Sequence, residues 1–175
     1  GKFKNVNYET KNINSFKEDV TNELFGAIGY LAEIDLIKKN LKNFSESLFT
    51  PKILFRHSPG DMRKQNDGPA LNALNAFSLD RLSNSEVLET GLSATIGFDY
   101  KMKKNNKKHN LSVAQIFNEK ENKKMASKTS LDEKASDVVG AYNYKFSEKI
   151  NFDYNFNIDQ NYKDLNYSSI VSSLN

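Results

Sequence analysis

The stretch Leu88–Met102, LETGLSATIGFDYKM, decides the fold class of this chain. Its side chains separate into two sets when they are read with a period of two, the period with which a β-strand alternates its side chains between opposite faces. The mainly apolar set consists of Leu88, Thr90, Leu92, Ala94, Ile96, Phe98, Tyr100 and Met102. The mainly polar set consists of Glu89, Gly91, Ser93, Thr95, Gly97, Asp99 and Lys101. A helix would mix the two sets around its circumference, so the pattern predicts a strand with one apolar and one polar face.

The length of this predicted strand indicates a particular environment. Strands usually contain about 5–6 residues, whereas a tilted strand that crosses a bilayer needs about 9–11. In an outer-membrane type of barrel, the apolar face of each strand contacts lipid and the polar face lines the lumen. The stretch is therefore typical of a barrel strand.

The composition excludes several classes of protein. The chain has 175 residues, enough for one domain, and a net charge of +3 from 25 basic and 22 acidic residues. This balance does not favour nucleic-acid binding. The absence of cysteine excludes disulfides and thiolate chemistry within the chain. No nucleophile elbow, phosphate-binding loop or zinc-protease motif is present in the sequence, so we expect neither catalysis nor a cofactor.

Strand patterns recur along the whole chain. We predict strands near residues 2–9, 23–38, 47–56, 87–102, 110–118, 138–146, 150–159 and 165–174. Segment 23–38 also fits a helical stripe through Leu24, Ile28 and Leu31. We favour a strand there because Gly26 and Gly29 would each cost about 1 kcal/mol inside a helix.

The connections between these strands alternate in length. Residues 10–22, 57–86 and 119–136 form long connections, and 41–46, 103–108 and 147–149 form short ones. Membrane barrels have short periplasmic turns and longer outer loops. The sequence therefore predicts an all-β, antiparallel up-and-down meander of about eight strands, as part of a large transmembrane β-barrel. We interpret residues 1–175 as one partial barrel domain and an internal piece of a longer protein, which alone forms an open curved sheet.

One proline constrains a predicted strand. Pro51 lies within the strand at 47–56 and has no N–H to donate to a neighbouring strand. We therefore expect it near a strand start or at a bulge.

Four stretches, taken in their order and spacing, resemble the barrel domain of the lipopolysaccharide-assembly family LptD, also called OstA. They are FTPKILFRHSP at 49–59, FSLDRLSNSEVLETGLSATIGFDY at 77–100, LSVAQIF at 111–117 and SLDEKASDVVGAYNYKF at 130–146. The chain departs from the pattern at Ala114, where glycine is frequent in the family. The resemblance covers roughly residues 48–174, and residues 1–47 fit by strand pattern only.

The resemblance implies a function in the cell outer membrane. LptD-like proteins accept lipopolysaccharide (LPS) from periplasmic bridge proteins, through an N-terminal jellyroll domain, and insert it into the outer leaflet. Their large barrel holds an LptE-like plug lipoprotein and opens laterally between its first and last strands. This chain would be a wall segment of such a translocon, with LPS, the plug, the bridge proteins and outer-membrane lipid as partners, without nucleic acid, cofactor or metal.

The strand alternation then assigns residues to each side of the wall. We expect the apolar side chains to face lipid, namely Leu92, Ile96, Phe98, Tyr100, Tyr142, Tyr144, Phe152, Tyr154 and Phe156. We expect the polar side chains to face the lumen, where they contact LPS or the plug, namely Glu89, Ser93, Thr95, Asp99, Asn143, Asn151, Asp153, Asn155 and Asn157. Two alternatives remain open. One is a soluble lipid-binding barrel, whose strands show the same alternation with the apolar side facing inward, and the other is a general porin-type channel.

Asp80 and Arg81 are the most distinctive charged pair of the long connection 57–86, and we assign them a role in structuring this loop. Such a pair predicts a local salt bridge, which contributes only about 0–1 kcal/mol when exposed. The alternative is contact with sugar-phosphate head groups through the guanidinium.

Other charged residues predict no chemistry. Asp132, Glu133 and Asp137 lack the spacing of a Ca²⁺ loop, so we interpret them as a solvated loop face. We interpret His57 and His109 as a loop and a turn histidine.

The lysines between positions 101 and 108 lack the interleaved aromatic residues of a nucleic-acid site. We interpret them as a solvated turn near periplasmic head groups.

Overall fold

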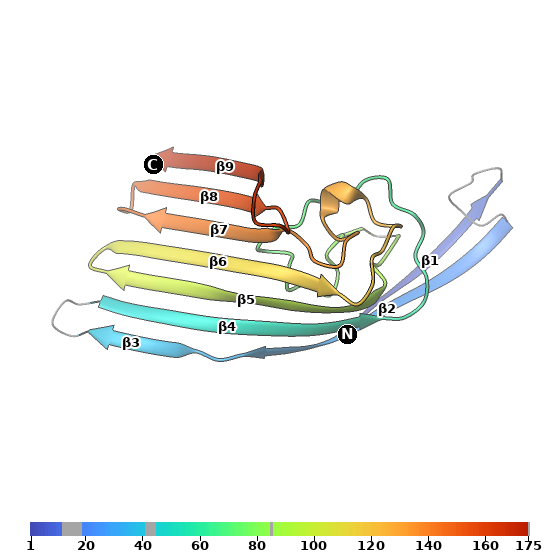
Figure 1. Cartoon of the computed structure of the whole chain (residues 1–175), viewed down its shortest axis with the longest axis horizontal. Coiled ribbons are helices and arrows are strands. Elements are labelled where there is room, and N and C mark those ends of the chain that lie inside the picture. Colours follow the sequence, from blue (N-terminus) through green and yellow to red (C-terminus); the bar gives the residue numbers. More distant parts are fainter. Residues whose placement is uncertain (12–18, 41–44, 85, 175) are drawn as a thin grey trace.

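The computed structural model describes residues 1–11, 19–40, 45–84 and 86–174, which form one curved antiparallel sheet (Figure 1). The strands are β1 Lys2–Thr10, β2 Asp19–Glu33, β3 Leu36–Asn40, β4 Ser45–Ser58, β5 Gly91–Lys104, β6 Lys107–Asn118, β7 Val138–Lys145, β8 Ile150–Ile158 and β9 Leu165–Leu174. Their order in the sheet is β1-β2-β4-β5-β6-β7-β8-β9, and β3 pairs with β4. The predicted all-β antiparallel meander is therefore confirmed, and the sheet is open, since β1 and β9 form its two edges.

The segment expected as one strand at 23–38 is strand rather than helix, and it divides into β2 and β3. Both pair with β4 in one continuous register, from Ile28 opposite His57 to Asn40 opposite Ser45. The division falls opposite Pro51. The Ile34 N–H donates to the Pro51 carbonyl at 3.3 Å, but proline has no N–H with which to return the bond.

The expectation that Pro51 lies near a strand start or a bulge is therefore wrong. The proline lies in the middle of β4, and the partner strand is interrupted instead. Another boundary also differs, because the strand expected from residue 87 begins at Gly91. Residues 87–90 belong to the loop that precedes it.

Short and long connections lie at opposite ends of the sheet (Figure 1). The turns between β5 and β6 and between β7 and β8 lie at the end that we call the turn end. Residues 59–90, 119–137 and 159–164 connect strands at the other end, which we call the loop end. The loop 119–137 contains the only helix of the described residues, the 3-10 helix η1 at Ser127–Thr129. No helix in the described part of the chain is long and apolar enough to cross a bilayer.

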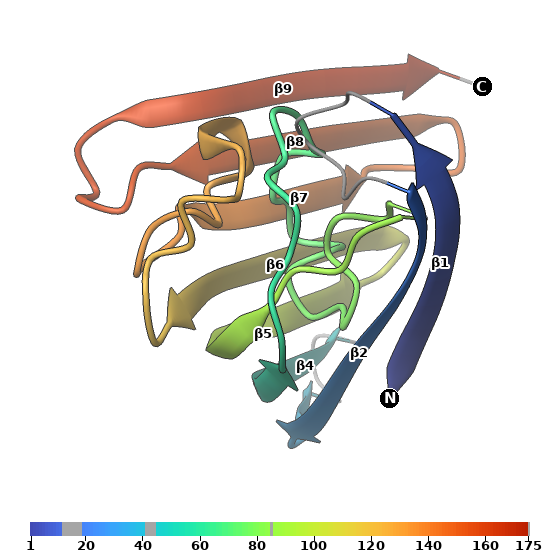
Figure 2. The same ribbon diagram turned by 90° about the vertical axis from the view of Figure 1, so that its right-hand side faces the viewer.

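The loops fold back into the curve of the sheet. Figure 2, viewed from the loop end, shows loops 59–90 and 119–137 inside the concavity, with β1 and β2 along one flank. We call the sheet face that they contact the concave face and the opposite one the convex face. Residues opposite each other in an antiparallel pair share a face, so the register assigns Arg56, Ser93 and Thr95 to the concave face and Phe55 and Ile96 to the convex face.

The apolar core lies between the loops and the concave face. Its members come from loop 59–90, loop 119–137, β6 and β7: Met62, Leu71, Ala76, Leu82, Val87, Met125, Leu131, Ala114, Ile116 and Val139. Strand β6 is apolar on both sides in sequence, and the structure gives the reason, since Ala114 and Ile116 pack beneath the loops. A smaller cluster of Phe25, Ala27 and Leu88, with Val6, joins β1 and β2 to the same loop.

Gly140 makes a close contact between β7 and β8. It lies directly opposite Phe156 on the convex face. A Cβ atom at position 140 would overlap the ring of Phe156, which lies across the glycine. An aromatic ring that covers a glycine on the neighbouring strand fills the space left by the missing side chain.

We predict that Gly140→Val destabilises the sheet, because Phe156 must leave its rotamer or the strands must separate. Overpacking of this kind typically costs about 1–3 kcal/mol. The measurement is the urea midpoint of the full-length protein folded in detergent. Ser172→Val, at an exposed convex position opposite Phe152, is the matched control. Equal midpoints for the two variants would contradict the prediction.

Candidate functional site

The two faces of the sheet differ sharply in exposure. Thr95 on the concave face is 0% exposed, whereas its neighbour Ile96 on the convex face is 51% exposed. Exposed apolar side chains continue across the convex face at Tyr30, Phe55 and Phe152. Along the strands, polar side chains are thus buried on the concave face and large apolar ones are exposed on the convex face, the reverse of the usual arrangement in a water-soluble sheet.

The residues to which we assigned the two sides of a barrel wall do occupy opposite faces. All nine residues expected to face lipid lie on the convex face. Eight of those expected to face the lumen lie on strands and share the concave face, and Glu89 lies in loop 59–90 against that face.

A buried guanidinium anchors loop 59–90 to the concave face. Arg81 Nη1 donates to Oε1 of Glu89 at 2.9 Å and to Oε2 at 3.2 Å. Its Nη2 donates to Ser93 Oγ at 3.2 Å and to Thr95 Oγ1 at 3.0 Å. The Arg81 side chain is 0% exposed and that of Glu89 is 4% exposed. A buried ion pair of this kind holds its geometry because separation leaves an uncompensated charge.

A second arginine fixes the same loop from β4. Arg56, which is also buried, donates from Nε to the Leu79 carbonyl at 3.0 Å and from Nη2 to the Glu89 carbonyl at 2.5 Å. Both carbonyls belong to loop 59–90. Arg56 therefore binds the loop backbone from the sheet, whereas Arg81 binds the sheet from the loop. The sequence does not indicate this role of Arg56, because its contacts form only when loop and strand are brought together.

The salt bridge expected between Asp80 and Arg81 is not the contact that shapes the loop. Adjacent residues point in different directions here: Arg81 enters the concave face, and Asp80 pairs with Lys4 of β1 at 2.8 Å. Lys4 also donates to the Val87 carbonyl at 2.9 Å. The loop thereby connects β5 with β1, a link that local sequence does not indicate because the partners are 76 positions apart.

Beyond the loops, the concave face carries a polar network on β7 and β8. Asn143 Nδ2 donates to Asn151 Oδ1 at 2.9 Å and to Asp153 Oδ1 at 2.7 Å. Asn151 donates to the other oxygen of Asp153 at 2.7 Å. Asn155 is exposed, and Asn157 is buried and donates to the Leu71 carbonyl at 2.9 Å. The face is thus partly covered by loops and partly open and polar.

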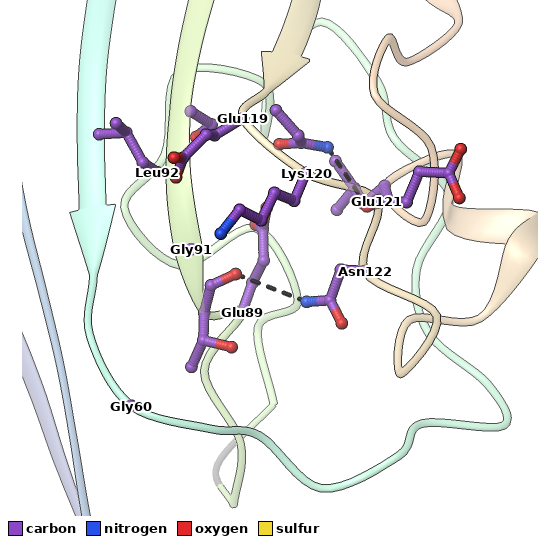
Figure 3. Close-up of a pocket in the computed structure, with 12 residues that line it drawn as sticks. Gly60, Glu89, Gly91, Leu92, Glu119, Lys120, Glu121 and Asn122 are labelled. Carbon is purple, nitrogen blue, oxygen red and sulfur yellow. Dashed lines mark hydrogen bonds between the residues drawn. The ribbon is translucent and has the colours of Figure 1, made fainter.

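Two of the hollows where the loops meet the sheet are lined mostly by polar residues. Figure 3 shows the smaller one, about 160 Å³, ringed by Gly60, by Glu89–Ser93 and by Asn118–Asn122, with Asn122 bonded to the Thr90 carbonyl. The larger one, about 540 Å³, lies between loop 119–137 and the ends of β8 and β9. Its lining is hydrophilic and includes Asp137 and Asn157.

The two loops are also tied to each other by charged side chains. Asp67 accepts hydrogen bonds from the Lys128 ammonium and, at 2.6 Å, from the Gly68 amide, and these donors lower the pKa of the Asp67 carboxyl. Because the folded pKa is depressed, this contribution is complete above about pH 4 and is lost as the pH falls through the lowered pKa.

The histidines lie in strands and not in connections. His57 is within β4 and His109 within β6, because both strands extend beyond their apolar alternation. His109 Nδ1 lies 2.7 Å from the Tyr142 hydroxyl, and its ring stacks on Tyr144 with centroids 4.4 Å apart. Among the residues that the structure describes, no group of three His, Cys, Asp or Glu side chains is arranged to hold a metal ion.

We predict that Arg81→Met opens loop 59–90, because Glu89 then stays buried without a counter-charge. Breaking a buried pair costs about 3–5 kcal/mol, so amide hydrogen exchange over residues 79–90 should accelerate roughly a hundredfold or more. Lys64→Met, an exposed change in the same loop, is the control.

The double variant Arg81→Met with Glu89→Met should recover much of the lost protection, since no buried charge is left unpaired. Unchanged exchange in the single variant would show that the ion pair does not hold the loop.

Comparison with known proteins agrees with this architecture. The family described as LptD, LPS transport system D, matches residues 43–174. A search of curated proteins found no match to the chain. The LptD family serves LPS transport and assembly, is associated with the outer membrane of Gram-negative bacteria and is not a family of enzymes. The resemblance described from the sequence is thus confirmed, and this chain belongs to the LptD family, LPS transport system D.

Proposed function

We propose that residues 1–175 form one partial barrel domain, a wall segment of an outer-membrane translocon that inserts LPS into the outer leaflet. The observation that carries this proposal is the exposure of the two faces of the sheet. The apolar convex face is exposed, and the polar concave face is partly buried beneath loops. The LptD membership of the chain supplies the transport system in which such a wall belongs.

The convex face suits contact with hydrocarbon. In water, an apolar surface spread over Tyr30, Phe55, Ile96 and Phe152 would promote association. In a bilayer the same surface is solvated by lipid tails. The strands are long enough for this role: β4 and β5 each contain 14 residues, and about 9–11 suffice to cross.

The open edges of the sheet also support a place in a barrel wall. Within the described residues, strands β1 and β9 each have one neighbour in the sheet, so one side of each backbone has no ladder partner there. Unpaired backbone groups are costly in hydrocarbon, which is why membrane sheets close into barrels. We infer that further strands of the longer protein pair with both edges and complete the barrel.

The concave face would act passively on the lipid that passes. Its open part carries amide and carboxylate groups on β7 and β8, and the larger hollow is lined by similar groups. Such groups exchange hydrogen bonds readily with saccharide hydroxyls and with water. We assign this surface to contact with the LPS sugars or with an LptE-like plug lipoprotein. Delivery by periplasmic bridge proteins and energy input would lie elsewhere in the system.

A soluble lipid-binding barrel would need the opposite arrangement. Its apolar side chains would enclose a cavity, and polar ones would face solvent. Here the loops cover the polar face, and Arg81 and Glu89 are buried on that side. The direction of the alternation, which strand periodicity leaves open, therefore favours the membrane barrel.

We predict that Ile96→Lys impairs assembly into the outer membrane, because a charge on the lipid face costs about 2–4 kcal/mol at mid-bilayer. Asn155→Lys, an exposed position on the concave face, should assemble normally. The measurements, on the full-length protein in Gram-negative cells, are the amount of heat-modifiable folded protein in the outer membrane and the amount of LPS at the cell surface.

The comparison of the two lysine variants separates the models. If Ile96→Lys assembles as well as Asn155→Lys, the convex face does not contact lipid. Solubility of the wild-type protein as a monodisperse species without detergent would also overturn the proposal.

A further inference from the structure

Charge is distributed unevenly between the two ends of the sheet. At the turn end, the residues described at 38–40, 45–46, 101–109 and 145–149 include nine lysines and two glutamates. At the loop end, the described residues of loops 59–90 and 119–137 include ten acidic and eight basic side chains. The turn end is therefore strongly basic, although the chain as a whole is nearly balanced.

The excess charge centres on the β5–β6 hairpin. We call Lys103, Lys104, Lys107 and Lys108 the turn lysines. They are all exposed, and none forms a salt bridge within the part of the chain that the structure describes. Elsewhere at this end, Lys39 pairs with Glu46 and Lys145 with Glu148. The acidic partners available at the turn end are thus already engaged.

The register of the hairpin places like charges together. Lys103 lies directly opposite Lys108, and Lys104 directly opposite Lys107. Like charges opposite each other in an antiparallel pair are destabilising. Two such pairs in succession create a concentrated positive field, which an external anion would relieve.

Aromatic side chains lie on the convex face at the same end of the sheet. The register gives this face to Lys104 and Lys107 as well, whereas Lys103 and Lys108 extend from the concave side of the same hairpin. His109 stacks on Tyr144, and Tyr144 stacks on Phe152 with ring centroids 6.4 Å apart. Lys107 Nζ lies 4.5 Å from the ring centroid of Phe146. Aromatic rings with polar atoms concentrate at the level of lipid head groups, and lysines beyond them extend toward the interface.

We propose that the turn lysines and the adjoining aromatic cluster bind the head groups of anionic phospholipids in the bilayer leaflet at the turn end. The inference rests on the proposed function, because it requires the convex face to lie in a membrane. Basic clusters next to a membrane-embedded surface attract anionic lipids by charge. The loop end, with its excess of acidic groups, offers no such attraction.

The test uses the full-length protein, purified in detergent and stripped of lipid. Phosphatidylglycerol and phosphatidylcholine are titrated separately, and bound lipid is counted by native mass spectrometry. The test variant carries Lys103→Gln, Lys104→Gln, Lys107→Gln and Lys108→Gln. A second variant replaces the same four residues with arginine. The matched control carries four exposed loop-end changes, Lys64→Gln, Lys120→Gln, Lys134→Gln and Lys163→Gln.

We expect the wild type to retain several-fold more phosphatidylglycerol than phosphatidylcholine. The glutamine variant at the turn should lose most of this preference, while the arginine variant and the loop-end control keep it. An unchanged preference in the glutamine variant, or an equal loss in the loop-end control, would overturn the proposal.

Assembly of each variant into the outer membrane and surface LPS are measured in parallel. A wild type absent from the outer membrane would refute the proposed function itself. Normal assembly with unchanged lipid preference in the glutamine variant would refute only the lipid site.

Discussion

The buried guanidinium of Arg81 holds together parts of the molecule that would otherwise be independent. It neutralises Glu89 and bonds two hydroxyls of β5, and the loop that carries it supplies five of the ten buried residues of the apolar core. Arg56 binds the backbone of that loop from β4. If the guanidinium were lost, Glu89 would have to take up water, and the loop would be displaced from the sheet. Arg81 and Glu89 can therefore stay buried against the polar face because each neutralises the charge of the other.

The pairing of Arg81 with Glu89 explains why the molecule has its core on the polar side of the sheet. The loops bring apolar residues such as Leu71 and Leu82 into a layer above Ile116, so the covered part of the concave face is a true hydrophobic core. The convex face has no counterpart to this layer among the described residues, and its apolar side chains remain exposed. The sheet thus has one face that is partly covered by loops and one exposed apolar face, and the excess of lysines at the turn end makes its two ends differ in charge.

The sequence predicts the strands well because a period of two is a direct consequence of backbone geometry, as Thr95 and Ile96 illustrate. It does not predict which face is inside, because a soluble barrel and a membrane barrel share that period. The sequence predicts Pro51 near a strand start or at a bulge and not its actual place in mid-strand, because the effect of the proline on a neighbouring strand depends on a partner that only the fold selects. The contacts of Arg81 cannot be predicted for a related reason. Its hydrogen bonds to the Ser93 and Thr95 hydroxyls and to the Glu89 carboxylate form only when loop and strand are brought together.

The ion pair between Lys4 and Asp80 has a consequence for the shape of the sheet. It joins β1, at one edge of the sheet, to loop 59–90, which Arg81 anchors to β5. The edge formed by β1 and β2 is therefore held to the loop by a side-chain ion pair as well as by the apolar contacts of Phe25, Ala27 and Leu88. The curved shape of this sheet is thus supported by contacts between its own strands and loops, without help from another chain.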